Sequence, residues 1–333
     1  MISIKITGTG SYLPPIVAAN SDYADIVDTS SEWILTRTGI EERRLSSGEP
    51  TWYMAQKAAE QALMSADTDP GELDGIIFAT ISGDYTTPSM SCVLQGKLGA
   101  KNALTIDINC ACAGLVYAID IAYRYLLSGF NKILVVGSEN LTKLADYSDR
   151  ASCILFGDGA GACVLEKSEG IYSSQLGSAG DDGTAIFARS QPPQNVFMTK
   201  GSLNEYDRLP LGNKHYITMD GKEIYKWATR IVPETVRGVC QKAGIDKSEI
   251  DWLVLHQANM RILEAAMKNL DLPMSKTYTN LQKYGNTSGA SIGICLDEMN
   301  REGLFKSGQK ICLVGFGAGL IYAGVLFEWG RDN

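Results

Sequence analysis

The residue best placed for covalent chemistry lies at the junction of an expected strand and an expected helix. Residues 102–108 are rich in apolar side chains and predict a strand, and apolar residues recur at the spacing of a buried helix from Leu115 to Leu127. Cys112 lies where that helix would begin. Because the first turn of a helix carries unpaired N–H groups and partial positive charge, a thiol there is expected to ionise more readily. The position therefore predicts a nucleophilic cysteine.

Two other polar residues occupy comparable junctions. The chain has only two histidines, and His256 ends a predicted strand at the place where open α/β sheets carry active groups. Asn286 opens a second apolar helix, whereas His215 belongs to residues 180–215, which read as loop. The side chains of Cys112, His256 and Asn286 could converge at the midline of one fold. By spacing alone, a histidine satisfied inside the core explains His256 equally well.

Pairs of similar segments recur at a nearly constant separation. The separation is 177 or 178 residues for most pairs and 162 for the last, where the second connection is shorter. This pattern predicts two halves of one fold, each alternating strands and helices. Chance similarity within an α/β chain is the alternative. Small residues open both central helices and are expected to let these helices pack closely together. The paired segments are 73–78 with 250–255, 132–137 with 310–315, and 161–166 with 323–328.

Composition limits the classes of protein to consider. With 333 residues, 45% hydrophobic and 20% charged, the chain suits one large or two medium globular domains. A formal charge of −8 argues against a nucleic-acid-binding protein. No apolar run approaches a membrane span, and residues 1–10 alternate like a strand and lack the apolar core of a signal peptide. The eight cysteines lie mostly in apolar runs, which indicates a reducing cytoplasm rather than a disulfide framework.

The chain resembles the β-ketoacyl-acyl carrier protein synthase III family, of the thiolase fold, from end to end. The resemblance implies an α/β, thiolase-like fold in which two pseudo-repeated halves, residues 1–172 and 173–333, build a layered αβαβα architecture. The implied activity is decarboxylative condensation of an acyl-CoA primer with malonyl-acyl carrier protein, which initiates fatty-acid synthesis. The matching stretches are 32–40, 107–114, 155–162, 219–226, 256–259, 284–288 and 315–319.

Two other functions fit parts of this pattern. One is a condensing enzyme or acyltransferase of specialised, polyketide-type metabolism with the same fold. The other is a scaffold that only docks carrier proteins, but such a protein would be expected to have lost Cys112, His256 or Asn286. A thiolase proper would carry a second cysteine in its last glycine-rich loop, and residues 315–319 contain none.

The resemblance also implies roles for the polar residues. Cys112 would take the acyl group from coenzyme A, and His256 and Asn286 would stabilise the enolate formed when the malonyl group loses CO₂. The backbone N–H groups of Cys112 and Ala318 would form an oxyanion hole. In the family this last loop usually reads Phe-Gly-Gly-Gly, so Ala318 can take its place only with a negative φ. Cys110 is expected to be structural, and neither a metal nor a cofactor is expected.

Binding residues follow from the same resemblance. Trp33 and Arg150 would clamp the adenine of coenzyme A, Arg37 would contact its phosphates, and Asn259 would bond the pantetheine arm. A homodimer in the cytoplasm, without nucleic-acid or membrane partners, is implied by the family. A basic rim would receive the acidic carrier protein, and its residues are Lys226, Arg261 and Lys268.

Thr87 bears on the length of the primer. Relatives that take the shortest primers carry a phenylalanine here that points into the acyl pocket, so Thr87 predicts a longer channel. The alternative is that Thr87 only caps the helix that is expected to begin at Pro88.

Overall fold

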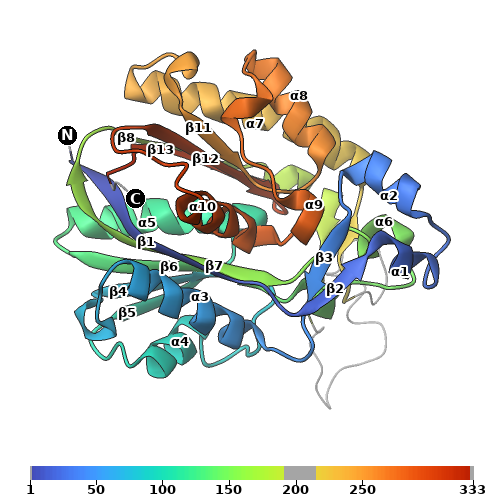
Figure 1. Ribbon diagram of the computed structural model, residues 1–333, viewed down its shortest axis with the longest axis horizontal. Helices are drawn as coiled ribbons and strands as arrows, with labels where there is room; N and C mark the ends of the chain where they lie inside the picture. The colour runs from blue at the N-terminus through green and yellow to red at the C-terminus, as the bar shows by residue number, and fades with distance from the viewer. Residues whose placement is uncertain (1, 191–214, 331–333) are drawn as a thin grey trace.

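Two β-sheets lie face to face with a layer of helices between them, and further helices cover each outer face (Figure 1). The computed structural model describes residues 2–190 and 215–330. The strand order is β1-β7-β6-β4-β5 in the first sheet and β11-β12-β13-β8 in the second. The first sheet comprises β1 (Ile2–Tyr12), β4 (Gly75–Ala79), β5 (Leu104–Ile108), β6 (Lys132–Glu139) and β7 (Gly159–Glu169). The second comprises β8 (Tyr172–Ser178), β11 (Trp252–Leu255), β12 (Lys310–Gly317) and β13 (Ile321–Glu328).

The helices complete a five-layer order (Figure 1). The central layer holds α5 (Gly114–Leu127) and α10 (Ser291–Arg301). The outer face of the first sheet is covered by α3 (Thr51–Ser65) and α4 (Met90–Leu98), and that of the second by α7 (Gly221–Ala243) and α8 (Met260–Leu270). The predicted αβαβα architecture is confirmed.

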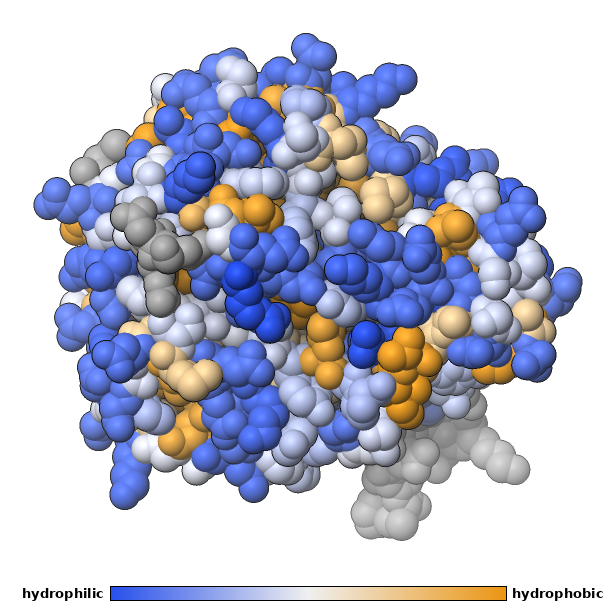
Figure 2. Space-filling model, in the orientation of Figure 1, coloured by the Kyte–Doolittle hydropathy of each residue, from blue (hydrophilic) through white to orange (hydrophobic). Residues whose placement is uncertain are grey.

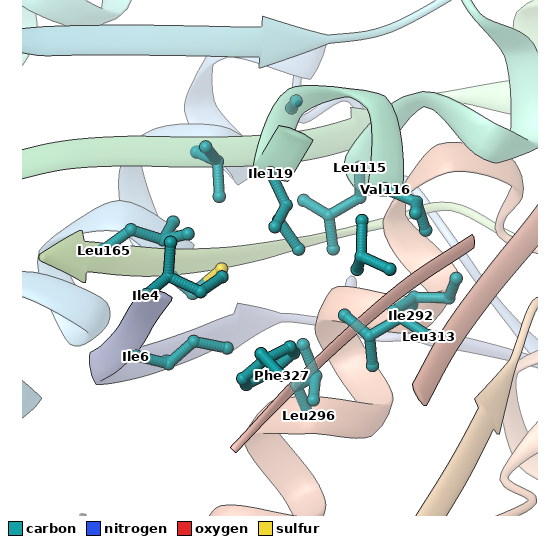
Figure 3. Close-up of a cluster of buried hydrophobic side chains, with 14 of the residues drawn as sticks. Ile4, Ile6, Leu115, Val116, Ile119, Leu165, Ile292, Leu296, Leu313 and Phe327 are labelled. Atoms are coloured by element: carbon teal, nitrogen blue, oxygen red, sulfur yellow. The ribbon is translucent and has the colours of Figure 1, made fainter. Parts of the chain in front are cut away.

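Side chains of both sheets and both central helices form one hydrophobic core (Figure 3). Ile119 of α5, Ile292 of α10, Leu165 of β7 and Leu313 of β12 are at most 1% exposed. Each such side chain contributes roughly 1.5–3 kcal/mol relative to its exposure to water. Because a sheet covers α5 and α10 on each side, most residues of both helices are buried. By contrast, the surface seen in Figure 2 is mainly hydrophilic, with apolar residues in small separate groups.

The sheet topology repeats along the chain. In the first half, β4 pairs in parallel with β6, β6 antiparallel with β7, and β7 antiparallel with β1. In the second half, β11, β12, β13 and β8 pair in the same order and the same directions. The repeat extends to backbone torsions, since Ala111 and Ser288, 177 residues apart, have positive φ values of 46° and 47°. The division of the chain after residue 172 remains a prediction.

Glycines bring the start of each central helix against a strand of the other half. A 3₁₀ turn precedes each helix, η2 (Ala111–Ala113) before α5 and η7 (Ser288–Ala290) before α10. A Cβ on Gly315 of β12 would lie 2.7 Å from Ala113 Cα, and one on Gly137 of β6 would overlap the carbonyl oxygen of Gly289. We expected small residues to bring the two central helices together, but these glycines bring each turn against a strand instead. The tightest contacts join each turn to a strand.

Smaller elements surround the end of the sheets where the three polar residues were predicted to meet (Figure 1). Of residues 180–215, the part up to 190 forms a 3₁₀ turn and a short strand, and residues 191–214 lie outside the described residues. Over the described ranges, no helix combines the length and apolar character needed to cross a bilayer. The smaller elements are α1 (Asn20–Ala24), α2 (Ser31–Thr38), α6 (Arg150–Cys153), α9 (Leu281–Tyr284), β2 (Ile16–Ala19), β3 (Glu42–Leu45), β9 (Ile186–Phe187) and β10 (Thr218–Met219).

Candidate active site

The three predicted polar residues line one pocket of about 430 Å³. Cys112 lies in η2 between β5 and α5, His256 directly follows β11, and Asn286 lies between α9 and η7. Each follows a strand end or precedes a central helix, so both halves contribute residues to the pocket. The fold therefore brings the three residues to one pocket, an outcome that their spacing in the sequence left open.

Cys112 is half-buried in the pocket wall. Burial raises the pKa of its thiol to about 12, the nearby Glu139 carboxyl adds to this rise, and the Ser288 hydroxyl opposes it. The expectation that the thiol ionises more readily at the helix start is therefore wrong. Desolvation outweighs the partial charge of the helix N-terminus. An acyl transfer to this thiol needs a group that accepts its proton.

His256 is a buried, neutral histidine with one ring nitrogen already engaged. Burial lowers the pKa of His256 to about 3. Nδ1 lies 2.7 Å from the Ser291 hydroxyl oxygen, which also accepts the Gln257 backbone N–H at 3.4 Å. When the Ser291 hydroxyl donates its hydrogen to Nδ1, the ring hydrogen of the neutral imidazole resides on Nε2. Phe316 packs edge-on against the ring at 5.3 Å between centroids.

Asn286 is held so that its amide NH₂ group is free. Its backbone N–H donates to the Leu155 carbonyl at 2.8 Å, and its carbonyl accepts from the Gly157 N–H at 3.0 Å. The side-chain Oδ1 accepts the Ser288 backbone N–H at 2.8 Å. With Oδ1 turned to the backbone, Nδ2 is the atom left to donate into the pocket. The motif at residues 155–162 thus anchors the backbone of Asn286, a role that the sequence did not reveal.

The side chains of His256 and Asn286 could together stabilise an oxyanion in the pocket that Cys112 also lines. Nε2–H of His256 and Nδ2–H of Asn286 are both neutral donors, and neither has to ionise to act. Neutral donors fixed before the reaction stabilise a developing oxyanion without reorganisation. Over the described ranges no cluster of three or more histidine, cysteine or acidic side chains is arranged to hold a metal ion.

The loop after β12 reaches the nucleophile from the opposite side. Gly317 lines the pocket, and a Cβ there would lie 2.9 Å from the Cys112 backbone nitrogen. Ala318 follows and is not among the non-glycine residues with positive φ, so the condition set for its oxyanion-hole role is met. Ala318 itself is not a lining residue of the pocket as described.

The mouth of the pocket carries a tryptophan between two arginines. The guanidinium carbons of Arg150 and Arg37 lie 4.9 Å and 5.8 Å from the Trp33 ring centroid. Arg150 also donates to the Asp28 carbonyl oxygen at 2.6 Å. Trp33 and Arg37 line the pocket, and Arg150 borders it by stacking on Trp33. A flat aromatic ring with two cations suits a planar ligand that carries phosphates.

Asn259, expected to bond the pantetheine arm, joins two helices at this mouth. Its Oδ1 accepts the Arg261 N–H at 2.9 Å and caps α8, while its Nδ2 donates to the Arg37 carbonyl of α2 at 3.0 Å. Asn259 lines the pocket, so one amide hydrogen and one lone pair remain for a ligand.

Basic side chains of α7 and α8 flank the mouth. Arg261 lines the pocket and its guanidinium carbon lies 5.7 Å from the Tyr225 ring centroid. Lys226 and Lys268 are exposed, and none of the three forms an ion pair with a residue that the structure describes. Lys222, in the first turn of α7, also lines the pocket.

Thr87 lies apart from the pocket that Cys112, His256 and Asn286 line. It is exposed and does not line the pocket of its own chain as described. Ser89, not Thr87, caps α4, because the Ser89 hydroxyl accepts the Cys92 backbone N–H at 3.3 Å. The sequence reasoning also assigned no role to Phe316, Ser288 or Ser291, although Phe316 and Ser288 lie inside matching stretches.

Comparison with known proteins identifies relatives along the whole chain. Residues 106–180 and 240–329 match the family models described as 3-oxoacyl-(acyl-carrier-protein (ACP)) synthase III and its C terminal. The β-ketoacyl-(acyl-carrier-protein) synthase III of Clostridium botulinum is 45% identical over 332 residues, and that of Clostridium acetobutylicum is 44% identical over 333 residues. Each alignment covers 99% of both chains.

Solved structures of related enzymes have a similar fold over nearly the whole chain. A 3-oxoacyl-(acyl-carrier-protein) synthase III from Aquifex aeolicus has a TM-score of 0.90 and 41% identity, covering 98% of this chain and 100% of its own. A priming β-ketosynthase from a polyketide biosynthetic pathway also has a TM-score of 0.90, with 33% identity, covering 99% of this chain and 97% of its own.

We predict that His256 keeps its proton on Nε2 and stays neutral from pH 5 to pH 8. Nitrogen-15 NMR of the histidine ring measures both properties, and a His215→Asn variant assigns the two histidines. Ser291→Ala should mix the two neutral tautomers, because Nδ1 loses its donor. A protonated ring at pH 5, or an Nδ1–H tautomer in the unchanged protein, would contradict the site geometry. Since His256 protonates near pH 6.5 once unfolded, acid below that pH should also lower stability.

Proposed function

Because the chain belongs to the 3-oxoacyl-(acyl-carrier-protein) synthase III family, it is an acyltransferase that condenses an acyl-CoA primer with malonyl-acyl carrier protein, and we propose that Cys112, His256 and Asn286 carry this reaction. The observation that carries the assignment is that one pocket is lined by the thiol of Cys112, the imidazole of His256 and the side-chain amide of Asn286. The reaction initiates fatty-acid synthesis.

The first half-reaction uses Cys112. Its sulfur attacks the carbonyl carbon of the acyl-CoA, the bond from that carbon to the CoA sulfur breaks, and the primer remains on Cys112 as a thioester. The backbone N–H groups of Cys112 and Ala318 would hold the carbonyl oxygen while it carries negative charge. Gly315 and Gly317 support this geometry, because only residues without a side chain let β12 approach the turn so closely.

The second half-reaction uses His256 and Asn286. Loss of CO₂ from the malonyl group places negative charge on the thioester oxygen, where Nε2–H and Nδ2–H donate. The enolate carbon then attacks the acyl group on Cys112, and the cysteine sulfur leaves. Each donor of this kind typically contributes a factor of about 10²–10³ in rate. No metal is required in this scheme, and coenzyme A acts as part of a substrate.

The pocket mouth would bind the two carriers in turn. We assign the adenine to Trp33 and Arg150, the phosphates to Arg37, and the pantetheine arm to Asn259. The malonyl group arrives on the same kind of arm, attached to an acidic carrier protein. The protein as a whole is acidic, so a local basic rim would orient that partner toward the mouth. The rim residues are Lys226, Arg261 and Lys268.

We propose a homodimer in which Thr87 serves the pocket of the partner chain. Strand β5 lies at the edge of its sheet, and Leu104 at its start is 40% exposed. Tyr85, two residues before Thr87, is 51% exposed. An open sheet edge beside exposed apolar side chains favours pairing with a second copy. Thr87 lies outside its own pocket, so a role in primer length requires such a partner.

The cytoplasm is the proposed location, because the nucleophile needs a reduced thiol and all eight cysteines are free. The similarity to a polyketide priming enzyme keeps specialised metabolism as the second candidate. Both candidates share the chemistry and differ in the primer and in the carrier protein. An assay of acyl-CoA primers against carrier proteins of both pathways separates them.

We predict that Cys112→Ala abolishes condensation but leaves slow decarboxylation of malonyl-acyl carrier protein. His256→Ala should do the reverse, retaining acylation of Cys112 while decarboxylation falls by about 10²–10³. Mass spectrometry of the protein measures acylation, and release of CO₂ measures decarboxylation. Near-complete condensation by Cys112→Ala would mean that another thiol, such as that of Cys110, is the nucleophile.

Reversing the charge of Arg261 or Lys268 should raise the KM for malonyl-acyl carrier protein by roughly fivefold and weaken its salt dependence. The factor corresponds to about 1 kcal/mol for an exposed pair. Turnover at saturation should change little, because neither residue contacts the reacting atoms. Lys167→Glu, an exposed reversal at the far end of β7, is the matched control. An unchanged KM at low ionic strength would contradict the rim assignment.

The Thr87→Phe homodimer should keep acetyl-CoA activity and lose octanoyl-CoA activity, since each buried methylene is worth about 0.8 kcal/mol, or roughly fourfold. A mixed dimer of one Thr87→Phe chain and one Cys112→Ala chain decides which pocket Thr87 serves. If Thr87 acts across the dimer, the intact Cys112 faces a threonine and octanoyl activity survives. Loss of that activity would place Thr87 with its own chain, and a preference of the unchanged enzyme for acetyl-CoA would contradict the long channel.

A further inference from the structure

A fully buried arginine lies behind Asn286, and the scheme above does not use it. Arg43 belongs to β3, next to α9, and is 0% exposed (Figure 1). Its hydrogen-bond acceptors are all uncharged, namely the carbonyl oxygens of Ile154 and Ala18 and the side-chain oxygen of Asn20. Burying a cation among uncharged partners is costly, and apolar side chains often replace buried charges without loss of stability. The presence of Arg43 therefore calls for a reason other than stability.

The guanidinium of Arg43 binds the chain directly after α6. Nε donates to the Ile154 carbonyl oxygen at 3.2 Å, and Nη2 donates to the same oxygen. Two donors in one rigid plane fix the direction of that carbonyl as well as its position, which a single ammonium group cannot do. Ile154 and the two residues that follow it, Leu155 and Phe156, all line the pocket.

The segment 154–157 holds the backbone of Asn286 on both sides. The Asn286 N–H donates to the Leu155 carbonyl at 2.8 Å, and the Gly157 N–H donates to the Asn286 carbonyl at 3.0 Å, so the two segments pair as a short parallel bridge. A shift of segment 154–157 would therefore move Asn286 with it. Because His256 follows β11 instead, such a shift would change the distance between the two side chains.

The aliphatic part of Arg43 packs against the same bridge. A Cβ on Gly157 would lie 3.2 Å from the Arg43 Cβ, and a Cβ on Gly285 would lie 3.2 Å from the Arg43 Cγ. Gly157 belongs to one segment of the bridge, and Gly285 directly precedes Asn286 in the other. Arg43 thus supports Asn286 in two ways, with its guanidinium on the Ile154 carbonyl and with its stem against both segments.

Arg43 is itself held in place by its neighbours. Nη1 donates to Asn20 Oδ1 at 2.7 Å, and Asn20 Nδ2 donates to the Ile40 carbonyl at 2.6 Å. The guanidinium carbon also lies 4.4 Å from the centroid of the Tyr23 ring. These contacts connect the guanidinium to α1 and to the chain after α2. A side chain fixed in this way can hold another residue at a defined place.

We propose that Arg43 is a positioning residue for Asn286. Acting through segment 154–157, it sets the place from which the Asn286 amide donates to the enolate oxygen during decarboxylation. Acylation of Cys112 does not use Asn286, so the two half-reactions should respond differently to the loss of Arg43. The proposal rests on the proposed function of Asn286.

The test compares the two half-reactions in Arg43→Met, which keeps an apolar stem and removes the guanidinium. Decarboxylation of malonyl-acyl carrier protein, measured as CO₂ release in the Cys112→Ala background, should fall about tenfold, because displacing a reacting group by about 1 Å costs up to roughly 10² in rate. Acylation of Cys112 at saturating acyl-CoA, measured by mass spectrometry, should change less than twofold. Arg43→Lys keeps the charge but not the two bonds to Ile154, so it should slow decarboxylation by about threefold.

Double variants separate positioning of Asn286 from general damage. In the Asn286→Ala background, Arg43→Met should slow decarboxylation less than twofold further, because the amide that it positions is already gone. In the His256→Ala background it should keep its full effect. Arg44→Met is the matched control, because its backbone carbonyl still accepts the Asp158 N–H at 2.8 Å, and both half-reactions should stay unchanged.

Equal loss of acylation and decarboxylation in Arg43→Met would overturn the proposal, because Arg43 would then only support the fold. Unchanged decarboxylation in Arg43→Met, or a full effect that persists in the Asn286→Ala background, would also overturn it. Thermal unfolding monitors the fold of each variant, and if Arg43→Met does not fold, Arg43→Lys serves for the same comparisons. Unchanged decarboxylation in Asn286→Ala alone would instead refute the proposed function of Asn286.

Discussion

The contact between β12 and the turn that carries Cys112 is the constraint on which the active site depends. Gly315 and Gly317 lack the side chains that would hold the strand away from Cys112 and Ala113. This close approach brings the loop after β12 to the sulfur and lets His256, on the neighbouring strand β11, reach the same pocket. A side chain at either glycine would separate the halves where the substrate reacts.

Burial then determines the chemistry of each group. The same loss of water raises the pKa of Cys112, lowers that of His256 and raises that of Glu139. Each group is therefore driven toward its uncharged form, as expected in a medium of low polarity. Uncharged N–H groups can stabilise an enolate oxygen. An uncharged thiol, in contrast, must lose its proton when its sulfur attacks a thioester. Burial thus favours stabilisation of the enolate, and it makes removal of the thiol proton a requirement for acyl transfer.

The two similar halves of the fold contribute different residues to the pocket. The two 3₁₀ turns share an unusual backbone, yet the first carries Cys112 where the second carries Gly289. The second turn instead contributes Ser288 and follows Asn286. One half therefore supplies the proposed nucleophile, and the other supplies the proposed donors to the enolate. Their meeting at a shared central layer of helices brings the two functions into one pocket (Figure 1).

The sequence by itself determined the two-half α/β organisation, the position of Cys112 at a helix start and the family. These features are local or periodic, so the order of residues expresses them directly. The tautomer of His256, the free amide of Asn286 and the pKa of Cys112 were decided only by the tertiary structure. So was the hydrogen bond between Ser288 and Glu139, two residues that lie 149 positions apart along the chain. Desolvation and such long-range contacts leave no periodic pattern, since they exist only after the halves have packed together.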